Sequence, residues 1–133
     1  LIRGDNKMGK PIINSIYFTK KDQHRPIMTY VTDASGLNID LHLQVIGFTL
    51  SQHTITLQVT DQDGRVKLPP TDQTIDAGFL KDRGGMGIMD TAFYLEMTPE
   101  DLINVRRLKF DISFDHEAHA TSYLFVTGGL DHA

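Results

Sequence analysis

The chain alternates apolar and polar residues over long stretches, and this alternation is its strongest structural signal. It is most regular between Leu37 and Val45, where the letters LNIDLHLQV place the apolar side chains on one side and the polar ones on the other. A helix would scatter the same residues around its circumference, so the pattern predicts a strand. One apolar and one polar face are typical of an antiparallel sheet with one side in water. Gly47 breaks the pattern just before Phe48 and predicts a bulge or bend there.

Similar alternation recurs along the chain and predicts about eight short strands separated by turn sequences. The segments expected to form strands are 12–19, 27–32, 37–45, 54–60, 66–68, 74–77, 93–97, 108–114 and 123–126, of which 66–68 and 74–77 are very short. The last segment is apolar on both faces, which is typical of a central strand or one pressed between layers. Many short strands with closely spaced turns indicate a sandwich or a small barrel. We therefore predict an all-β fold, an antiparallel β-sandwich, with one short helix near residues 99–105.

The helix prediction depends on the letters TPED at residues 98–101. They suit an N-cap, a proline at the first helical position and acids in the first turn. The letters DQDG at residues 61–64 predict a hairpin turn that leads into a short return strand. Pro69 and Pro70 are expected to end that return strand, because neither proline can donate to a ladder.

A length of 133 residues predicts one domain. We expect residues 1–10 to be a flexible lead-in, residues 11–128 to form the β-sandwich, and residues 129–133 to begin a linker or tail. The first residue is Leu1 and not Met, so we interpret the chain as a piece of a longer protein. No apolar run approaches the ~20 residues of a membrane span, and no membrane insertion is expected.

Composition and charge restrict the partners. Cysteine is absent, which excludes disulfides and thiolate metal sites. The formal net charge is −4, and the densest basic cluster is Arg106, Arg107 and Lys109. An acidic chain without a basic stripe is a poor match for a phosphate backbone, so no nucleic-acid partner is expected.

Two clusters carry the residue types of a metal site. In the letters DHEAHA, His116 and His119 flank Glu117, with Asp115 beside them, and imidazoles and carboxylates suit zinc or nickel. The cluster lies in an expected hairpin loop and no second cluster completes it, so we interpret its histidines as solvated and expect no metal. Residues 61–64 resemble the start of a calcium loop, but the position that requires a bidentate Glu holds another residue, and a hairpin turn explains them.

The sequence carries no pattern of catalytic or cofactor-binding residues. The glycine cluster at 84–87 precedes a strand, whereas a phosphate cradle requires a helix N-terminus there. No G-x-S-x-G elbow is present, and no carboxylate pair has a physical reason for a shifted pKa. We therefore predict that the chain is not an enzyme and binds no cofactor. The residues expected to make contacts lie in two loops: Gly84, Gly85, Met86, Gly87, Asp115, His116, Glu117 and His119.

Several segments together resemble a known kind of domain. The hairpin around DGR, the stretch AFYLEMTPEDL and the closing pair RRLKFDISF and TSYLFVTGG are similar to the N-terminal β-sandwich of phage baseplate upper proteins from siphophages of Gram-positive hosts. The matching positions are 61–66, 93–102 and 108–126. The resemblance implies an assembly domain that holds receptor-binding proteins on a tail tip and is followed by a linker or coiled coil. It implies no catalytic residues.

These observations lead to one main hypothesis and two alternatives. We predict a non-enzymatic structural or assembly module that has protein partners or self-associates, in a virion or at an extracellular surface. The first alternative is a carbohydrate-binding or surface-adhesion module with a glycan partner. Its candidate stacking residues are Tyr30, Tyr94 and Tyr123, and the absence of Trp weighs against it. The second alternative is a metal-dependent enzyme built around His116 and His119.

Overall fold

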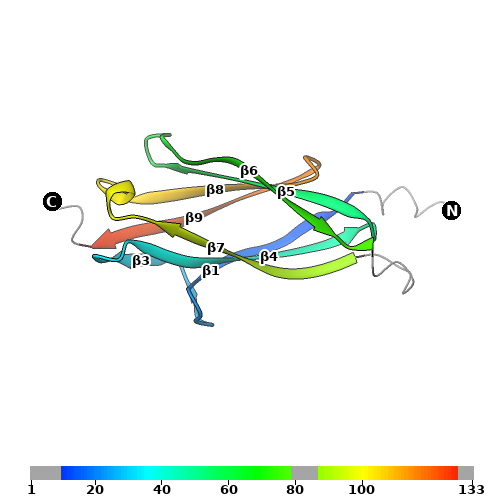
Figure 1. Ribbon diagram of the computed structural model, residues 1–133, viewed down its shortest axis with the longest axis horizontal. Coiled ribbons are helices and arrows are strands. Elements are labelled where there is room, and N and C mark those ends of the chain that lie inside the picture. The colour runs from blue at the N-terminus through cyan, green and yellow to red at the C-terminus, as the bar shows by residue number, and fades with distance from the viewer. Residues whose placement is uncertain (1–9, 79–86, 129–133) are drawn as a thin grey trace.

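Two β-sheets pack face to face in the computed structural model of the chain, which describes residues 10–78 and 87–128 (Figure 1). The four-stranded sheet has the order β2-β1-β4-β7. Its strands are β1 (Ile12–Lys20), β2 (Pro26–Ile27), β4 (Leu37–Phe48) and β7 (Gly87–Met97). The five-stranded sheet has the order β3-β9-β8-β5-β6. Its strands are β3 (Thr29–Thr32), β5 (Gln52–Asp61), β6 (Val66–Asp76), β8 (Arg107–Phe114) and β9 (Ala118–Gly128).

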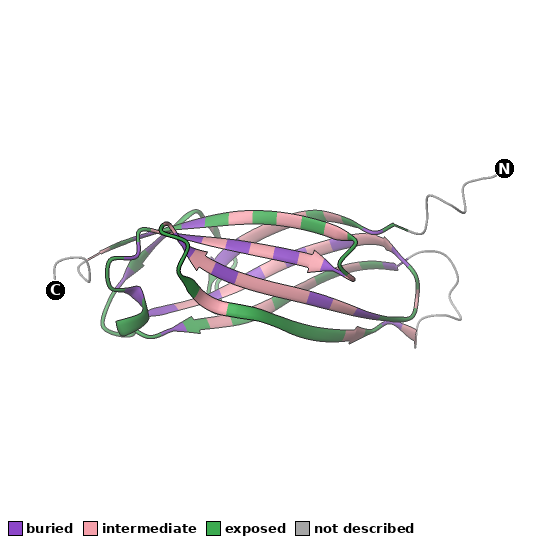
Figure 2. Ribbon diagram, turned by 90° about the horizontal axis from the view of Figure 1, so that it is seen from above, coloured by how far each residue is buried: buried purple, intermediate pink, exposed green. Residues whose placement is uncertain are grey.

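Alternating burial along the strands produces a single core between the sheets, visible as the banded colouring of Figure 2. The apolar residues of β4 are fully buried from Leu37 to Val45, as their alternation predicts. They face the inward residues of β8, and the rings of Phe18 and Phe110 meet across the two sheets at 4.6 Å between centroids. The predicted β-sandwich is therefore confirmed, and β4 and β8 form its centre.

The bulge expected at Gly47 is present. Gly47 has φ of 84°, and the register between β4 and β7 shifts between Ile46 and Phe48. Gly87, opposite Phe48, leaves room for the Phe48 ring, because a Cβ at that position would collide with it. Glycine at both positions thus bends the strand and lets an aromatic ring close this end of the core.

The segment 27–32 differs from its prediction as a single strand. It contains β2 in one sheet and β3 in the other, and the chain changes sheets at Met28. β3 then pairs with β9 in parallel, whereas the other pairs are antiparallel. Tyr30 and Thr32 are buried while Thr29 and Val31 are exposed, so the period-2 pattern holds only after the crossing.

The prediction that Pro69 and Pro70 end a strand is wrong, because β6 continues through them to Asp76. β6 lies at the edge of its sheet, where a missing N–H on the open side costs nothing. The register with β5 also shifts between Leu57 and Val59, which places the two prolines in a bulge.

The helix expected at 99–105 is a single 3-10 turn, Glu100–Leu102. Thr98 and Asp101 cap it reciprocally: the Asp101 N–H donates to the Thr98 Oγ1, and the Thr98 N–H donates to the Asp101 Oδ2, each at 3.3 Å. Leu102 and Val105 are buried, and β8 begins at Arg107, so the chain has length for only one turn. In the described ranges no helix is long and apolar enough to cross a membrane.

Candidate functional site

The glycine loop expected to make contacts lies mostly outside the described residues. Gly84, Gly85 and Met86 fall within the segment 79–86, which the structure does not describe. Gly87 is the first residue of β7 and is buried against Phe48. Its position gives it a packing role at the end of the core.

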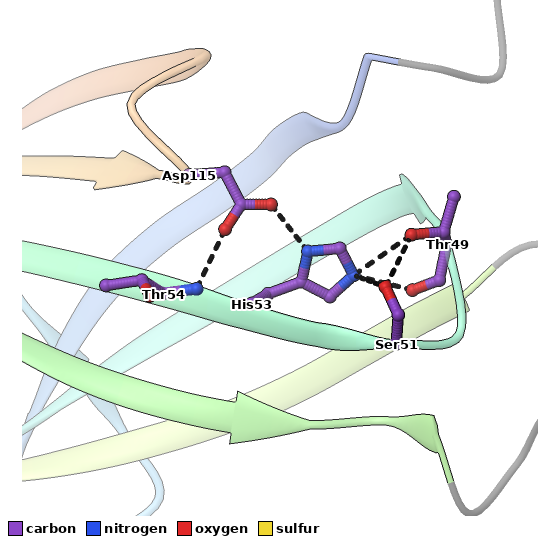
Figure 3. Close-up of polar contacts among 5 residues, drawn as sticks. All are labelled: Thr49, Ser51, His53, Thr54 and Asp115. Carbon is purple, nitrogen blue, oxygen red and sulfur yellow. Dashed lines mark hydrogen bonds and ion pairs between the residues drawn. The ribbon is translucent and has the colours of Figure 1, made fainter.

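Asp115 begins the turn between β8 and β9, and its partly buried carboxylate points toward His53 and the backbone nitrogen of Thr54 (Figure 3). Asp115 and His116 have φ of 53° and 58°, a conformation that Asp and His tolerate better than most residues. The Asp115 Oδ1 accepts the N–H of Thr54 at 2.8 Å, and its Oδ2 lies 2.5 Å from Nδ1 of His53. The carboxylate therefore joins the β8–β9 turn to β5.

His53 completes this cluster and was not anticipated from the sequence. Its side chain is buried, and its Nε2 lies 2.6 Å from the carbonyl oxygen of Thr49. The hydroxyls of Thr49 and Ser51 are farther from the same nitrogen, at 3.4 Å each. The ring also lies 4.9 Å from the ring of Phe114, centroid to centroid.

The cluster contains Asp, His and Ser but lacks the geometry of a nucleophilic triad. In such a triad the histidine nitrogen that faces the serine is free to accept the hydroxyl proton. Here the nearest partner of the His53 Nε2 is the Thr49 carbonyl, an acceptor, so this nitrogen donates and cannot take a proton from Ser51. The two close partners of the ring are both acceptors, and the ring fastens the β4–β5 loop to the β8–β9 turn.

The other residues of the predicted contact loop separate in the structure. His116 and Glu117 are exposed at the tip of the turn, whereas His119 lies on β9 opposite Ser113. Among the residues that the structure describes, no group of three His, Asp or Glu side chains could hold a metal ion.

The calcium-like residues 61–64 form the β5–β6 turn, as the hairpin interpretation predicts. The Asp61 Oδ1 accepts the N–H groups of Asp63 and Arg65, each at 2.9 Å. Burial raises the pKa of Asp61, but these two hydrogen bonds and the charges of Lys67 and Arg65 outweigh it, so its pKa lies below the ordinary value. The carboxylate thus acts as the internal acceptor of the turn.

The outer face of the five-stranded sheet carries an exposed apolar group, here called the outer aromatic patch: Val31, Tyr123 and Phe125. These side chains are 63%, 45% and 49% exposed, respectively. Phe125 is paired with Thr29 of β3 on one side and with Arg107 of β8 on the other. The Arg107 guanidinium lies over the Tyr123 ring, 5.0 Å from its centroid. The segment 123–126 lies in an interior strand of its sheet, between β3 and β8, as one of the two expectations for it states. Only Leu124 and Val126 face the core, so the second apolar face is exposed and is not pressed between layers.

A shallow polar hollow of about 240 Å³ continues the same face beyond Tyr123. Its lining residues come from β5, β6, β8 and β9: Thr56, Gln58, Pro70, Asp111, Ile112, Ser113, His119, Ala120 and Thr121. The Thr121 hydroxyl donates to the Asp111 Oδ1 at 2.7 Å. Hydroxyl, amide, carboxylate and imidazole groups therefore adjoin the aromatic patch.

The three tyrosines considered as a stacking platform do not share a surface. Tyr30 is buried, and its hydroxyl accepts the N–H of Asn38 at 3.1 Å. Tyr94 lies on the outer face of the four-stranded sheet, where Lys21 lies over its ring, and Tyr123 lies on the opposite sheet. Phe125, which the sequence analysis did not single out, is the aromatic neighbour of Tyr123 along β9.

Comparison with solved structures identifies several chains of similar fold. A bacterial adhesin from Mobiluncus mulieris, which contains disulfide, isopeptide and ester cross-links, aligns with a TM-score of 0.60 and 12% identity, over 90% of this chain and 58% of that one. A putative β-galactosidase from Bacteroides fragilis aligns with a TM-score of 0.53 and 14% identity, over 87% of this chain and 17% of that one. A β-glucuronidase from Bacteroides uniformis gives a TM-score of 0.51 and 11% identity, over 87% of this chain and 14% of that one.

These similarities define a fold and not a family. The identities are low, and the chain spans less than two thirds of each of these structures. No protein-family model matches the sequence, and no curated protein is significantly similar to it. The class of protein is therefore a β-sandwich module whose fold also occurs within larger glycosidase and adhesin chains.

Proposed function

We propose that the chain is a non-catalytic adhesion or assembly module that binds a protein partner, or a second copy of itself, through the outer face of its five-stranded sheet. The outer aromatic patch is the observation that carries this proposal. Phe125 and Tyr123 are about half exposed in the middle of a regular strand, where period-2 alternation would ordinarily place polar side chains.

The chemistry of the patch is that of a protein interface. Aromatic residues and Arg are enriched in interface centres. Aromatic side chains bury a large apolar area at a low cost in conformational entropy, because they have only two χ angles. Arg107 already lies over Tyr123, so its guanidinium is held in place before a partner arrives. The patch also lies on strands rather than loops, which limits the cost of ordering it.

The fold neighbours support a binding role without a reaction. One is described as an adhesin, and the two glycosidases match this chain over only 17% and 14% of their length. One accessory, non-catalytic domain of a larger enzyme would account for a match over so small a part of its length. The geometry at His53 is consistent with a role without catalysis, because its Nε2 donates to the Thr49 carbonyl and cannot accept a proton from Ser51.

The narrower form of the proposal is a baseplate domain of a phage tail that holds receptor-binding proteins. It is supported by the sequence resemblance at 61–66, 93–102 and 108–126. The direct test is to co-express the chain with the genes that flank its gene and to purify any complex that forms with their products. A stable complex with a receptor-binding protein would support it, and chromatographic separation of the chain from all of these products would contradict it.

Carbohydrate binding is the second candidate, and the polar hollow beside Tyr123 favours it. Sugars require a planar apolar surface together with hydroxyl, amide and carboxylate partners, and both are present on this face. A glycan array discriminates between the two candidates. A hit that is abolished by Tyr123→Ser and retained in Tyr94→Ser would make the sheet face a sugar site, and an array without hits would remove this candidate.

The assembly proposal is tested with a double variant, Tyr123→Ser with Phe125→Ser, and with Tyr94→Ser as the matched control on the opposite sheet. Sedimentation equilibrium measures self-association, and the flanking gene products serve as candidate partners. Loss of the two anchors is expected to weaken binding by tenfold or more, since interface anchors typically contribute about 2 kcal/mol or more each. A wild-type chain that stays monomeric and binds none of these proteins would overturn the proposal.

A further inference from the structure

Within the part of the chain that the structure describes, β7 has one side without a strand neighbour. In the described residues, 10–78 and 87–128, it pairs with β4 alone and forms the edge of the four-stranded sheet. The strand runs from Gly87 to Met97, which is long for an edge. Its unpaired N–H and C=O groups are therefore a template for a further strand.

The edge that faces β7 across the sandwich is protected, and β7 is not. β6 carries Pro69 and Pro70 within a bulge, which are usual devices against strand addition. β7 contains no Pro, Lys or Arg. Its register with β4 is regular from the pair Leu37–Met97 to the pair Ile46–Ile88. The two edges thus differ in whether they can accept another chain.

An apolar cleft of about 230 Å³ lies between these two edges. It is lined by Leu41, Ile55, Leu57, Leu68, Thr71, Gln73, Phe93, Tyr94, Leu95 and Ile112. Phe93 and Leu95 from β7, with Leu57 and Leu68 from the other sheet, face the core but remain only partly buried. The core is therefore incompletely covered along this side.

We propose that the β7 edge receives an extended strand from a partner protein, with apolar side chains at alternate positions that fill this cleft. Alternate residues of a strand are about 6.6 Å apart, which matches the spacing of Phe93 and Leu95 on the neighbouring edge. Main-chain hydrogen bonds to β7 provide the affinity, and the cleft selects the side chains.

Charge identifies the outward side of the incoming strand. The outward residues of β7 include Asp90 and Glu96, both exposed. Cross-strand neighbours on a sheet face favour opposite charges, so the outward positions of the partner are expected to be Lys or Arg. A second copy of β7 would add two further carboxylates and no cation, so the charges favour a different chain as the occupant.

The test uses a fluorescein-labelled synthetic peptide, KVKLTVKLK, whose alternate residues are apolar and whose other face is basic. Fluorescence anisotropy measures its affinity for the full chain. Two control peptides are matched to it, one with backbone methyl groups on the amides that would face β7, and one with Glu in place of Lys. Both controls are expected to bind at least tenfold more weakly.

Thr91→Lys and Ala92→Lys add the same charge on opposite faces of β7. Thr91 points inward, and an inward lysine at an edge blocks strand addition, whereas Ala92 points outward. Thr91→Lys is expected to weaken binding of the peptide at least tenfold more than Ala92→Lys does. Gln73→Trp, at an exposed position on the rim of the cleft, fills the same space from β6 and gives a second blocking variant should Thr91→Lys fail to fold.

This inference does not depend on the outer aromatic patch, and the two can fail separately. The variant Tyr123→Ser with Phe125→Ser is expected to bind the peptide within about twofold of the wild type. Equal losses in Thr91→Lys and Ala92→Lys, or no binding up to about 1 mM peptide, would overturn strand addition. A wild-type dimer that Thr91→Lys dissociates, with no binding of the peptide, would overturn the choice of a partner chain as occupant.

Discussion

At the residue scale, the polar contacts that organise this chain connect turns and loops. His53 and Asp115 are distant in sequence, yet they meet at the end of the sandwich where the β4–β5 loop and the β8–β9 turn approach each other. Asp61 performs a similar role within one turn, through two backbone donors. These carboxylates satisfy N–H groups that strand pairing leaves without a partner.

The hydrogen bonds between His53, Asp115 and Thr54 are expected to stabilise the folded chain, so a variant that removes them should be less stable. Asp115→Ala leaves the Thr54 N–H and the buried ring of His53 without their acceptor. We expect the free energy of unfolding to fall by about 1–3 kcal/mol. Urea titration measures this, with the exposed His24→Ala as a control expected to change it by less than about 0.5 kcal/mol. Equal effects of the two variants would contradict the role of the cluster.

Asp61 is expected to make stability depend on pH at the acidic end. Its pKa is lowered in the folded chain, so its contribution is fully present above the unfolded value of about 3.9 and is lost as pH falls through the folded value. Asp61→Asn should therefore lie below the wild type near neutral pH and approach it in acid. Urea titrations across pH measure the difference, with Asp63→Asn as the neighbouring control. A constant difference across pH would contradict the assignment.

At the element scale, the sequence could predict the core strands because burial alternates along them. The phase of Leu37–Val45 and of Leu108–Phe114 identifies the core side directly. Three features depend on information outside the local pattern. The prolines of β6 are tolerated because the strand is at an edge, the segment 27–32 divides because β3 pairs with β9, and the helix shortens because β8 begins at Arg107.

The candidate sites were harder to predict than the strands. Tyr123 and Phe125 could have been placed outward by phase, since Leu124 and Val126 continue the inward series of β9. The His53–Asp115 contact has no local signal, because it depends on how a loop and a turn meet in three dimensions. The openness of the cleft beside β7 likewise depends on sheet order, which periodicity alone does not give.

Two glycines in turns offer a matched comparison at this scale. Gly36 and Gly64 have nearly equal φ, 79° and 80°, so Ala pays a similar backbone cost of about 1–2 kcal/mol at both. A Cβ at Gly36 would also collide with the carbonyl of Met97, whereas Gly64 has open space around it. Gly36→Ala is therefore expected to cost about 1–3 kcal/mol more in urea unfolding than Gly64→Ala does. Equal losses of unfolding free energy in the two variants would contradict this and mean that the backbone at Met97 moves aside without a cost.

At the scale of the whole molecule, one core supports two surfaces with different properties. The outer aromatic patch lies on the face of a sheet, so a partner there would contact side chains. The β7 edge would contact a partner through backbone N–H and C=O groups and through the apolar cleft beside it. A partner at the patch leaves the sandwich as it is, while a strand at β7 would extend a sheet and cover core residues. A partner at either surface should stabilise the fold if it binds only the folded state, so the two surfaces differ in whether core residues become covered.

Because both sheets share this core, the domain is expected to unfold in one cooperative transition. Phe110 is fully buried on β8 and touches Phe18 of the other sheet, so Phe110→Ala should lower the free energy of unfolding by about 3–5 kcal/mol. The loss should be the same by far-UV circular dichroism and by tyrosine fluorescence. Hydrogen exchange gives a sharper test, since amides of β4 and β8 should open with equal free energy in the wild type and fall together in the variant. Loss of protection in β8 while β4 retains it would mean that the sheets are separate folding units, and the cleft beside β7 would then reflect a loose interface and not a vacant strand position.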